Sequence, residues 1–323
     1  MRVNRGVALT FCPLLFAAFA AILPAADPAP APWFRDNDRV VLLGDTFIER
    51  EGDRGFIETA LVASHPDAAL TIRNLGWSGD TVWAESRGVF DAPAKGYERM
   101  LALVRELGPT VVVVAYGRNE SFRGPEGLPA FRTQLQKLCT DLRSLGGPTA
   151  AATSPASAGA ASPADPRLLL VTPHPFEGPE AAARNAALAD YAAAIRDLAR
   201  AQGAALVDLF ADIRRHAAAD AALTENGTHL SDSGYAAAAA VLVASCGKTP
   251  PDGFPASAAD LRRLVVEKNR LFFHRWRPAN ETYIFLFRKH EQGNNAVEIP
   301  QFDPLVEAAE ARVRAAAAGT RSR

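Results

Sequence analysis

The sequence has little excess charge of either sign. Its 323 residues contain 35 Lys and Arg against 36 Asp and Glu, which gives a formal charge of -1. It therefore lacks the positive field that draws a protein to nucleic acid, and we expect no nucleic-acid partner. With 48% hydrophobic and only 22% charged residues, the chain can bury one sizeable core, so we do not expect disorder throughout.

Cysteine is also scarce. The chain has three cysteines, and their spacing does not match a set of metal ligands, so we expect no metal site. Cys12 lies in an N-terminal segment that we expect to be removed, which leaves Cys139 and Cys246. An oxidising compartment would permit these two to pair, but two separately buried thiols suit the sequence at least as well.

The N-terminus has the pattern of an export signal. Arg2 and Arg5 precede an apolar run over residues 7–23, and small residues follow. This pattern predicts a signal peptide over residues 1–25 and an exported protein that is periplasmic, cell-envelope-associated or extracellular. A membrane anchor is the alternative, because the run approaches the ~20 residues that span a bilayer. Pro24 and the Pro/Ala tract after it favour removal, so we expect no stable membrane span afterwards.

Apolar runs of strand length recur along the chain, and several are continuous, as in strands buried on both faces. Segments with helical spacing lie between them. This alternation predicts an α/β fold in which helices cover both faces of a parallel sheet, giving three α/β/α layers. The expected strands are 39–44, 69–75, 110–115, 168–172 and 204–209, and the main expected helices are 97–107, 128–145 and 180–202.

Two breaks in composition divide the chain. Residues 146–166 are almost entirely Gly, Ala, Ser, Thr and Pro, a composition that cannot fill a core, and we expect a mobile surface insertion there. Residues 247–255 are rich in Pro and Gly and close the α/β region. We therefore expect one α/β domain over residues 33–246, followed by a C-terminal extension over residues 256–323.

The extension differs in character from the rest of the chain. It is expected to be helical at 261–273 and 304–318, with aromatic, Arg and amide residues concentrated between these helices. Aromatic rings beside Arg suit stacking on sugars or binding a partner. The alternative is that these rings pack onto the α/β core.

Polar blocks follow four of the expected strands. In an open parallel sheet, ligands bind beyond the carboxyl ends of the strands, so these blocks mark the candidate site. No glycine-rich phosphate fingerprint follows the first strand, which argues against a nucleotide-binding domain. The blocks are Gly44-Asp45-Thr46, Trp77-Ser78-Gly79-Asp80, Tyr116-Gly117-Arg118-Asn119-Glu120 and Asn226-Gly227-Thr228-His229.

In this order the blocks resemble those of SGNH/GDSL hydrolases, an esterase and lipase-like family, over residues 39–245. The resemblance implies a flavodoxin-like, five-stranded parallel sheet and no cofactor. It places Thr46 where the family has its nucleophilic serine, and His229 as the catalytic base. Gly79 and Asn119 match the oxyanion hole, and Asn226 stands where the family has an aspartate.

The chemistry that the resemblance implies is acyl transfer. A hydroxyl is a poor nucleophile near neutral pH, so His229 would take the proton of Thr46 as it attacks an ester carbonyl. The N–H groups of Thr46 and Gly79 and the Asn119 amide would each stabilise the oxyanion by ~3 kcal/mol. We therefore expect an esterase for acyl or acetyl esters, with carbohydrate esters suggested by the family and by export. Nothing in the sequence specifies an oligomeric state.

Two substitutions bear on this activity. The methyl of Thr46 restricts its side-chain rotamer. Asn226 cannot stabilise an imidazolium as a carboxylate does, and the equivalent change in serine proteases lowers turnover about 10⁴-fold. Glu225 and Asp232 are candidates to supply the missing charge, although Asp232, or Ser231 beside it, also suits the N-cap of the following helix. The alternative function is a catalytically impaired protein of this fold that binds a glycan or a cell-envelope partner.

Each candidate residue also has a structural interpretation. The Thr46 hydroxyl would cap a helix, Gly79 would form a tight turn with positive φ, and Asn119 would bridge loop backbone. Asp45 is expected to hold the Thr46 turn by accepting backbone N–H groups. His174, after the fourth expected strand, approaches the cleft by the same sheet rule or remains an ordinary loop histidine.

Overall fold

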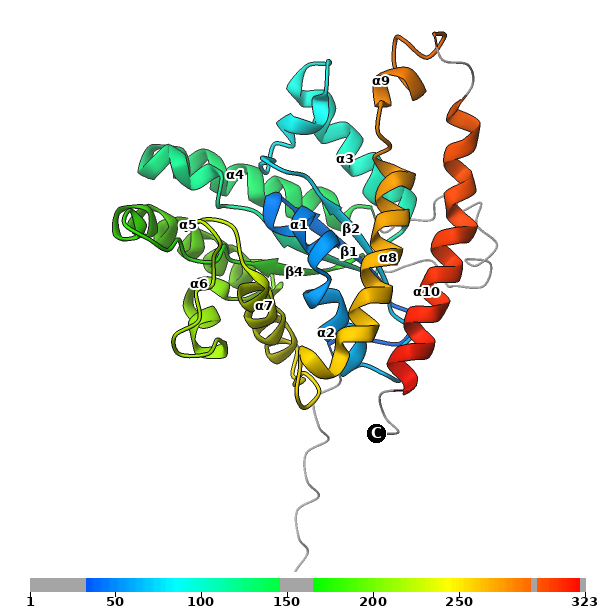
Figure 1. Ribbon diagram of the computed structural model, residues 1–323. Coiled ribbons are helices and arrows are strands. Elements are labelled where there is room, and N and C mark those ends of the chain that lie inside the picture. The colour runs from blue at the N-terminus through cyan, green and yellow to red at the C-terminus, as the bar shows by residue number, and fades with distance from the viewer. Residues whose placement is uncertain (1–32, 146–164, 292–294, 320–323) are drawn as a thin grey trace, which may run out of the picture. The chain divides into compact units, whose positions relative to one another are not determined.

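The computed structural model describes residues 33–145, 165–291 and 295–319. The predicted signal peptide at 1–25 and nearly all of the insertion predicted at 146–166 lie outside these residues. Five parallel strands form one sheet in the order β2-β1-β3-β4-β5 (Figure 1), which confirms the predicted fold class. The strands are β1 (Arg39–Gly44), β2 (Thr71–Gly76), β3 (Val111–Ala115), β4 (Arg167–Val171) and β5 (Ala205–Val207).

The register of the central strands brings three polar loops to one edge of the sheet. Gly44, the last residue of β1, pairs with Gly76 of β2 and with Ala115 of β3. All three strands therefore end at the same level, and the loops after them begin side by side. Gly44 is required there, because a Cβ would lie 2.5 Å from the Ala115 carbonyl oxygen.

Helices cover both faces of the sheet, and alternate strand residues supply two separate cores. Val40 and Leu42 of β1 belong to the core under α1 (Thr46–Arg54), α2 (Phe56–Ser64) and α7 (Asp232–Ser245). Val41 and Leu43 belong to the opposite core, under α3 (Pro93–Leu107), α4 (Gly124–Arg143) and α5 (Ala181–Ala201). This period-two alternation explains why the strands read as continuous apolar runs.

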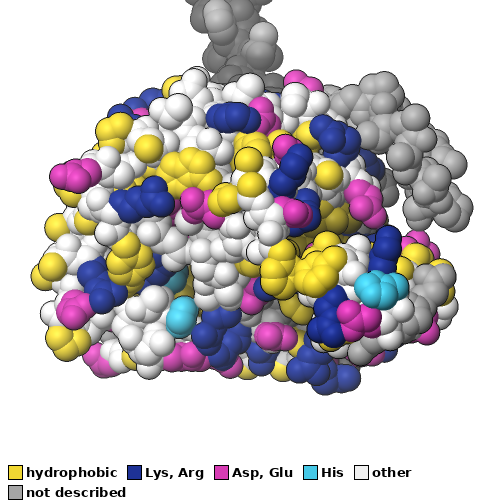
Figure 2. Space-filling model, turned by 90° about the horizontal axis from the view of Figure 1, so that it is seen from above, with side chains coloured by type: hydrophobic (Ala, Val, Ile, Leu, Met, Phe, Trp, Pro, Cys, Tyr) yellow, Lys and Arg dark blue, Asp and Glu magenta, His cyan; other side chains and the backbone are white. Residues whose placement is uncertain are grey.

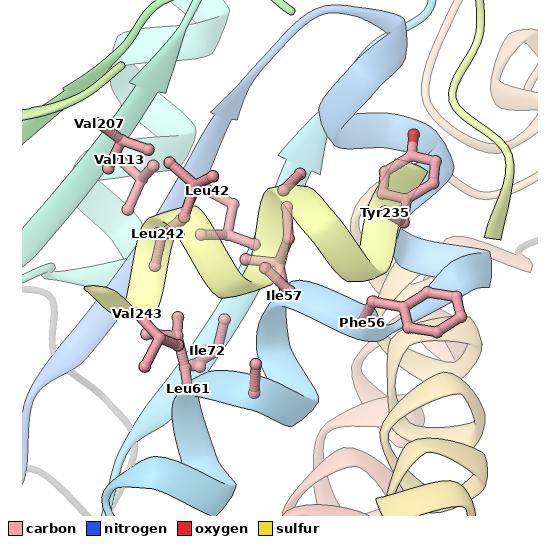
Figure 3. Packing of buried hydrophobic residues seen from close by; sticks show 14 of the residues in the cluster. Leu42, Phe56, Ile57, Leu61, Ile72, Val113, Val207, Tyr235, Leu242 and Val243 are labelled. Carbon is pink, nitrogen blue, oxygen red and sulfur yellow. The ribbon is translucent and has the colours of Figure 1, made fainter. Parts of the chain in front are cut away.

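Figure 3 shows the first core from close by. Leu42, Ile72 and Val113 project from the sheet toward Ile57 of α2 and Leu242 of α7. Branched side chains from three strands thus pack against helices that lie far apart in the chain. This packing holds α1 and α7 on the same face of the sheet. Helix α1 carries Thr46, and α7 follows the loop that contains His229.

Most predicted elements match, and the differences have local causes. β1 has the predicted bounds, whereas β5 ends at Val207, before the predicted 209. The Asp208 carboxylate accepts the N–H of Ala211 and so caps the short helix α6 (Leu209–Asp212), which ends the strand. α3 begins at Pro93, earlier than predicted, because proline suits the first turn of a helix.

The C-terminal segment adds two long helices to the α/β core. α8 (Ala259–Trp276) packs against α1, α2 and β2, and α10 (Phe302–Gly319) lies beside α8 (Figure 1). Lys268 of α8 is completely buried and donates to the Ile72 carbonyl oxygen at 2.8 Å. The remaining short elements are η1 (Glu85–Gly88), η2 (Glu120–Arg123), η4 (Ile213–His216), η5 (Ala256–Ala258), α9 (Glu281–Ile284) and η6 (Asn295–Gln301).

Only part of the aromatic residues in this segment packs onto the α/β core. Phe272 is buried against the core, whereas Phe285 and Phe287 are exposed. Phe287 forms an edge-to-face pair with Phe90, with ring centroids 5.6 Å apart. Figure 2 views the molecule from the side on which α9 lies, and hydrophobic side chains gather there beside Lys, Arg and His side chains.

The two described cysteines are both buried and unpaired. Cys139 lies in the core on one face of the sheet and Cys246 in the core on the other, so the alternative of two separate thiols is confirmed. Burial raises the pKa of each thiol to about 12. Among the described helices, none is long and apolar enough to cross a membrane. The described residues also contain no group of three or more His, Cys, Asp or Glu that could hold a metal ion.

Candidate active site

The turn after β1 places Thr46 at the first position of α1. Asp45 is the N-cap of this helix, and its carboxylate accepts the N–H of Phe47 at 2.9 Å. Asp45 therefore holds the turn by accepting a backbone N–H, as expected, and it caps the helix in place of the Thr46 hydroxyl. Burial raises the pKa of Asp45 to about 6, although the Phe47 hydrogen bond and the charge of Arg118 oppose this rise.

Thr46 and Gly79 meet directly across the edge of the sheet. The Gly79 N–H donates to Thr46 Oγ1 at 3.0 Å. Gly79 has φ +73°, as its turn requires, and a Cβ built there would meet nothing within 4 Å. The N–H that the sequence assigns to the oxyanion hole therefore lies within hydrogen-bond distance of the predicted nucleophile.

Asn119 joins the same turn from the loop after β3. Its Nδ2 donates to the carbonyl oxygen of Asp80 at 2.7 Å. The amide nitrogen carries two hydrogens, so one remains for a further acceptor. The carboxylate of Asp80 is buried beside Arg87, whose Nε donates to it at 2.7 Å. Asn119 thus bridges loop backbone and still offers a donor, so both of its expected roles are compatible.

The contact between Asn226 and His229 determines the hydrogen position on the imidazole ring. Asn226 Oδ1 accepts the N–H groups of Thr228 at 3.1 Å and of His229 at 2.9 Å. Its Nδ2 therefore faces His229 Nδ1, at 3.2 Å. An amide nitrogen only donates, so Nδ1 accepts and the ring hydrogen lies on Nε2. A carboxylate at position 226 would favour the opposite tautomer.

The surroundings of His229 favour its neutral form. Its pKa is lowered from the ordinary value, first by burial and then by the charges of Arg50 and Arg118, whereas Glu225 raises it. Thr46 and His229 line the same cleft, and within the described residues no hydrogen bond joins them.

Glu225 and Asp232 face arginines of α1 instead of the imidazole ring. Glu225 forms ion pairs with Arg50, at 2.6 Å, and with Arg54, and Asp232 also pairs with Arg54. The backbone N–H of Glu225 donates to the His229 carbonyl oxygen at 2.8 Å and so closes the turn. Ser231 and Asp232 were the two residues expected to cap α7, and Ser231 is the N-cap. Its hydroxyl accepts the N–H of Gly234 at 3.2 Å.

A small cleft brings Thr46, Asn119 and His229 together. Its volume is ≈ 40 Å³, enough for a few water molecules at ~10–15 Å³ each. A larger groove of ≈ 520 Å³ runs along α8 and contains none of the predicted residues, so the site is identified by its chemistry and not by its size. The cleft is lined by Asp45, Thr46, Phe47, Arg50, Arg118, Asn119, Phe122, His174, Thr228, His229, Leu230 and Tyr235.

Comparison with known proteins identifies the family of this chain. Residues 42–237, more than half of the chain, match the sequence model of the GDSL-like lipase/acylhydrolase family. The chain belongs to this family. All four blocks that carry the predicted site lie within the matched segment, and the family's chemistry is ester hydrolysis.

The solved structure of an acetylxylan esterase shows the same fold. The acetylxylan esterase Axe2 from Geobacillus stearothermophilus is similar with a TM-score of 0.50 and 18% identity, over 66% of this chain and 95% of that chain. LAE5, an alpha/beta hydrolase from the metagenome of Lake Arreo in Spain, is similar with a TM-score of 0.49 and 19% identity, over 66% and 97%. At these identities the similarity concerns the fold. No curated protein matched the sequence.

Arg118 is the main residue of this GDSL-type cleft that the sequence did not single out. It is buried, and its guanidinium donates to the carbonyl oxygens of His174 at 2.5 Å and Thr228 at 2.7 Å. Arg118 thereby ties the loops after β3 and β4 to the loop that carries His229. Burial lowers its pKa to about 10, and the charge of Asp45 partly offsets this. In the sequence, the only indication that Arg118 joins these loops was its position inside the third polar block.

His174 lines the cleft, which is one of the two positions expected for it. It is buried, and its pKa is held well below the ordinary value by burial and by the charge of Arg118. Its Nδ1 lies 3.3 Å from the Arg118 guanidinium and 3.2 Å from the Pro175 carbonyl oxygen. A neutral, constrained imidazole here shapes the wall of the cleft.

Proposed function

We propose that the protein is an exported esterase that removes small acyl groups, acetyl above all, from a carbohydrate. The observation that carries this proposal is the hydrogen bond from the Gly79 N–H to Thr46 Oγ1, in a cleft that also contains Asn119 and His229. Membership of the GDSL-like family and a fold shared with an acetylxylan esterase support the reaction class. The cleft volume of ≈ 40 Å³ favours a short acyl chain.

In the proposed mechanism, Thr46 Oγ1 bonds to the ester carbonyl carbon and its proton passes to His229 Nε2. The carbonyl oxygen becomes negative and accepts the Gly79 N–H and one hydrogen of the Asn119 amide. The alcohol then leaves with the proton from His229, and water hydrolyses the acyl-threonine by the same route. His229 needs a free lone pair on Nε2 for the first step, so its hydrogen must move to Nδ1.

Asn226 opposes that tautomer. A hydrogen on Nδ1 would face the Asn226 amide nitrogen, which is itself a donor. Turning the amide around would give up the two backbone hydrogen bonds to its Oδ1. We therefore expect the proposed esterase to turn over more slowly than a family member that has aspartate at this position.

The proposal includes export, and the sequence pattern of residues 1–25 supports it. The domain bounds, 33–246 for the hydrolase domain and 256–323 for the extension, belong to the same proposal. N-terminal sequencing of protein secreted by an expressing host tests export: a mature chain beginning near residue 26 is expected. A chain that retains its first residues in the membrane fraction would contradict it.

The catalytic test uses the chain without residues 1–25. Initial rates are measured on p-nitrophenyl acetate, on p-nitrophenyl butyrate and on acetylated xylo-oligosaccharides, for the wild type, Thr46→Ala and His229→Ala. We expect measurable turnover, acetate preferred over butyrate, and loss of about 10²-fold or more in each variant. Equal rates in all three proteins would remove the catalytic proposal.

The contact of Asn226 with His229 favours one alternative, a protein that binds a glycan in the same cleft without turnover. With its hydrogen on Nε2, His229 offers a donor for a hydroxyl or carbonyl oxygen instead of a base. Under this alternative, Thr46→Ser with Asn226→Asp produces strong esterase activity that the wild type lacks. Calorimetric titration with acetylated and deacetylated oligosaccharides measures binding, and no heat of binding would count against the alternative.

A further inference from the structure

Around Gly79 itself, the turn that carries the proposed oxyanion donor is held by hydrogen bonds. A Cβ built on Gly79 meets nothing within 4 Å, so no neighbouring side chain buttresses the turn at that point. The N–H of Ser78 donates to Glu49 Oε2 at 2.8 Å, and the Ser78 hydroxyl donates to Glu49 Oε1 at 2.7 Å. Both oxygens of Glu49, which lies on α1 three residues after Thr46, are thus committed to the residue before Gly79.

One arginine of the C-terminal extension contacts both the carboxylate and the turn. Arg277, at the end of α8, donates from Nη1 to Glu49 Oε2 at 2.5 Å. Its guanidinium carbon also lies 3.6 Å from the centroid of the Trp77 ring, the first residue of the turn. Glu49 and Arg277 are about one quarter exposed, so solvent screens this ion pair only in part.

The neighbouring aromatic residues complete this contact. Trp276, which precedes Arg277, packs on Trp77 with ring centroids 5.9 Å apart. On the other side, Arg87 lies 5.6 Å from the Trp77 ring and pairs with Asp80 at 2.7 Å. The turn is therefore anchored at its end by a buried arginine of the family segment, and at its start by Arg277.

Arg277 lies outside the segment that matches the family, unlike the residues that line the cleft. The family match covers residues 42–237, and Arg277 lies 40 residues beyond its end. A carboxylate that accepts from Ser78 alone is free to rotate toward solvent, whereas the guanidinium holds it in one orientation through a charge-assisted hydrogen bond. The planar guanidinium can stack on the indole and pair with the carboxylate at once, which an ammonium group cannot do.

We propose that Arg277 is a positioning residue that sets the oxyanion turn from the C-terminal extension, so that the extension completes the active site. The part of this proposal that concerns turnover rests on the proposed esterase function. The part that concerns how rigidly the backbone of residues 77–80 is held does not rest on that function, and amide hydrogen exchange measures it separately.

The experiment compares four proteins: the wild type, Arg277→Ala, Arg277→Lys and Arg275→Ala. Arg275 is the matched control, because it lies two residues away and pairs with Glu106 and Asp303 instead of the turn. The first readout is amide hydrogen exchange at residues 77–80. We expect exchange at Ser78 and Gly79 to rise about 10-fold in Arg277→Ala, to rise less in Arg277→Lys, and to stay within about 2-fold in Arg275→Ala.

The second readout is the kinetics of acetate ester hydrolysis. A misplaced oxyanion donor acts on the transition state, so we expect kcat to fall about 10- to 100-fold in Arg277→Ala with KM within about 3-fold. Arg277→Lys should retain part of the activity, because its ammonium group can keep the ion pair with Glu49.

Failure of the two proposals is distinguishable. A wild type without esterase activity removes the proposed function, and the exchange rates still decide the role of Arg277. Exchange at Ser78 and Gly79 that is the same in Arg277→Ala and Arg275→Ala overturns the inference, whatever the kinetics. In an active enzyme, faster exchange without a fall in kcat overturns its catalytic part.

Discussion

At the scale of single residues, the activity of the proposed esterase depends on which nitrogen of His229 carries the hydrogen. Asn226 donates to Nδ1 because its oxygen already accepts two backbone N–H groups. Regardless of this tautomer, Thr46 and Asn119 line the cleft and the Gly79 N–H donates to Thr46 Oγ1. In the proposed esterase, the residues that would bind the ester are therefore assembled, and His229 is held in the tautomer that cannot act as a base.

Replacing Asn226 with aspartate should restore the reactive tautomer. The carboxylate can keep one oxygen on the backbone N–H groups and accept a hydrogen from Nδ1 with the other, which frees Nε2 as a base. We expect kcat for acetate esters to rise by about 10² to 10⁴, taking the serine-protease effect as the upper bound. The double variant Asn226→Asp/His229→Ala is the control and should lose the gain. An unchanged kcat in Asn226→Asp would contradict the assignment of the tautomer.

The pH dependence of the esterase should report the charges around His229. Only the neutral ring accepts a proton, and its lowered pKa places the rising limb of activity below the pH usual for histidine. Arg50→Ala removes a charge that lowers this pKa, so the limb should move to higher pH, as measured by kcat/KM against pH. Arg132→Ala, an exposed arginine paired with Asp197, should leave it in place. A shift to lower pH in Arg50→Ala would be inconsistent with this account.

At the scale of elements, the break between α1 and α2 depends on a buried carboxyl group. Gly55 ends α1 with φ +69°, and Glu51 Oε1 accepts the N–H groups of Ile57 at 2.7 Å and Glu58 at 3.2 Å. Glu51 thus caps α2 from the preceding helix. Burial raises its pKa to about 8, although the hydrogen bonds from α2 oppose the rise.

This raised pKa makes stability depend on pH. Because the folded pKa of about 8 lies above the ordinary value of 4.5, the folded state binds the proton more tightly, and stability falls as pH rises from about 4.5 to about 8. Glu51→Gln cannot ionise and keeps an accepting oxygen. Urea denaturation should show similar stability at pH 5 and a variant more stable by roughly 3 kcal/mol at pH 8. Exposed Glu98→Gln is the control, and parallel pH dependences in wild type and Glu51→Gln would refute the role of Glu51.

At the scale of the whole molecule, buried charges join the C-terminal helices to the α/β core. Lys268 Nζ lies 2.7 Å from Glu58 Oε1, and both side chains are at most 1% exposed. Arg73 of β2 pairs with Glu310 of α10 nearby. Through these contacts α8, and with it Arg277, has a defined position relative to the oxyanion turn.

Removing one partner of the buried pair should be costly, and removing both should not. Lys268→Met leaves Glu58 buried without its cation, so we expect a loss of about 3–5 kcal/mol in the free energy of unfolding at pH 8. Lys268→Met with Glu58→Leu should recover most of it, because the buried charge is gone as well. Urea denaturation of the three proteins measures both effects. A double variant as unstable as Lys268→Met would show that Glu58 is not the cause.

The fold and the order of the site blocks follow from patterns that are local in sequence. The run at 39–44 predicted β1 with its observed bounds, because a strand covered on both faces must be apolar throughout. Parallel strands end at one edge, so the blocks after them were expected to meet. Strand β5 was predicted too long, because the apolar run continues into α6 and the cap at Asp208 marks the boundary only weakly.

The sequence by itself determined the α/β layers, the family and the substitution of the expected aspartate by Asn226. Only the tertiary structure decided which atom of Asn226 faces His229, and that Arg277 meets Glu49 across 228 positions of the chain. It also decided that Cys139 and Cys246 lie on opposite faces of the sheet. The physical reason is that apolar periodicity is a property of neighbouring residues, whereas a hydrogen bond or an ion pair requires particular atoms from distant segments at a set distance and angle.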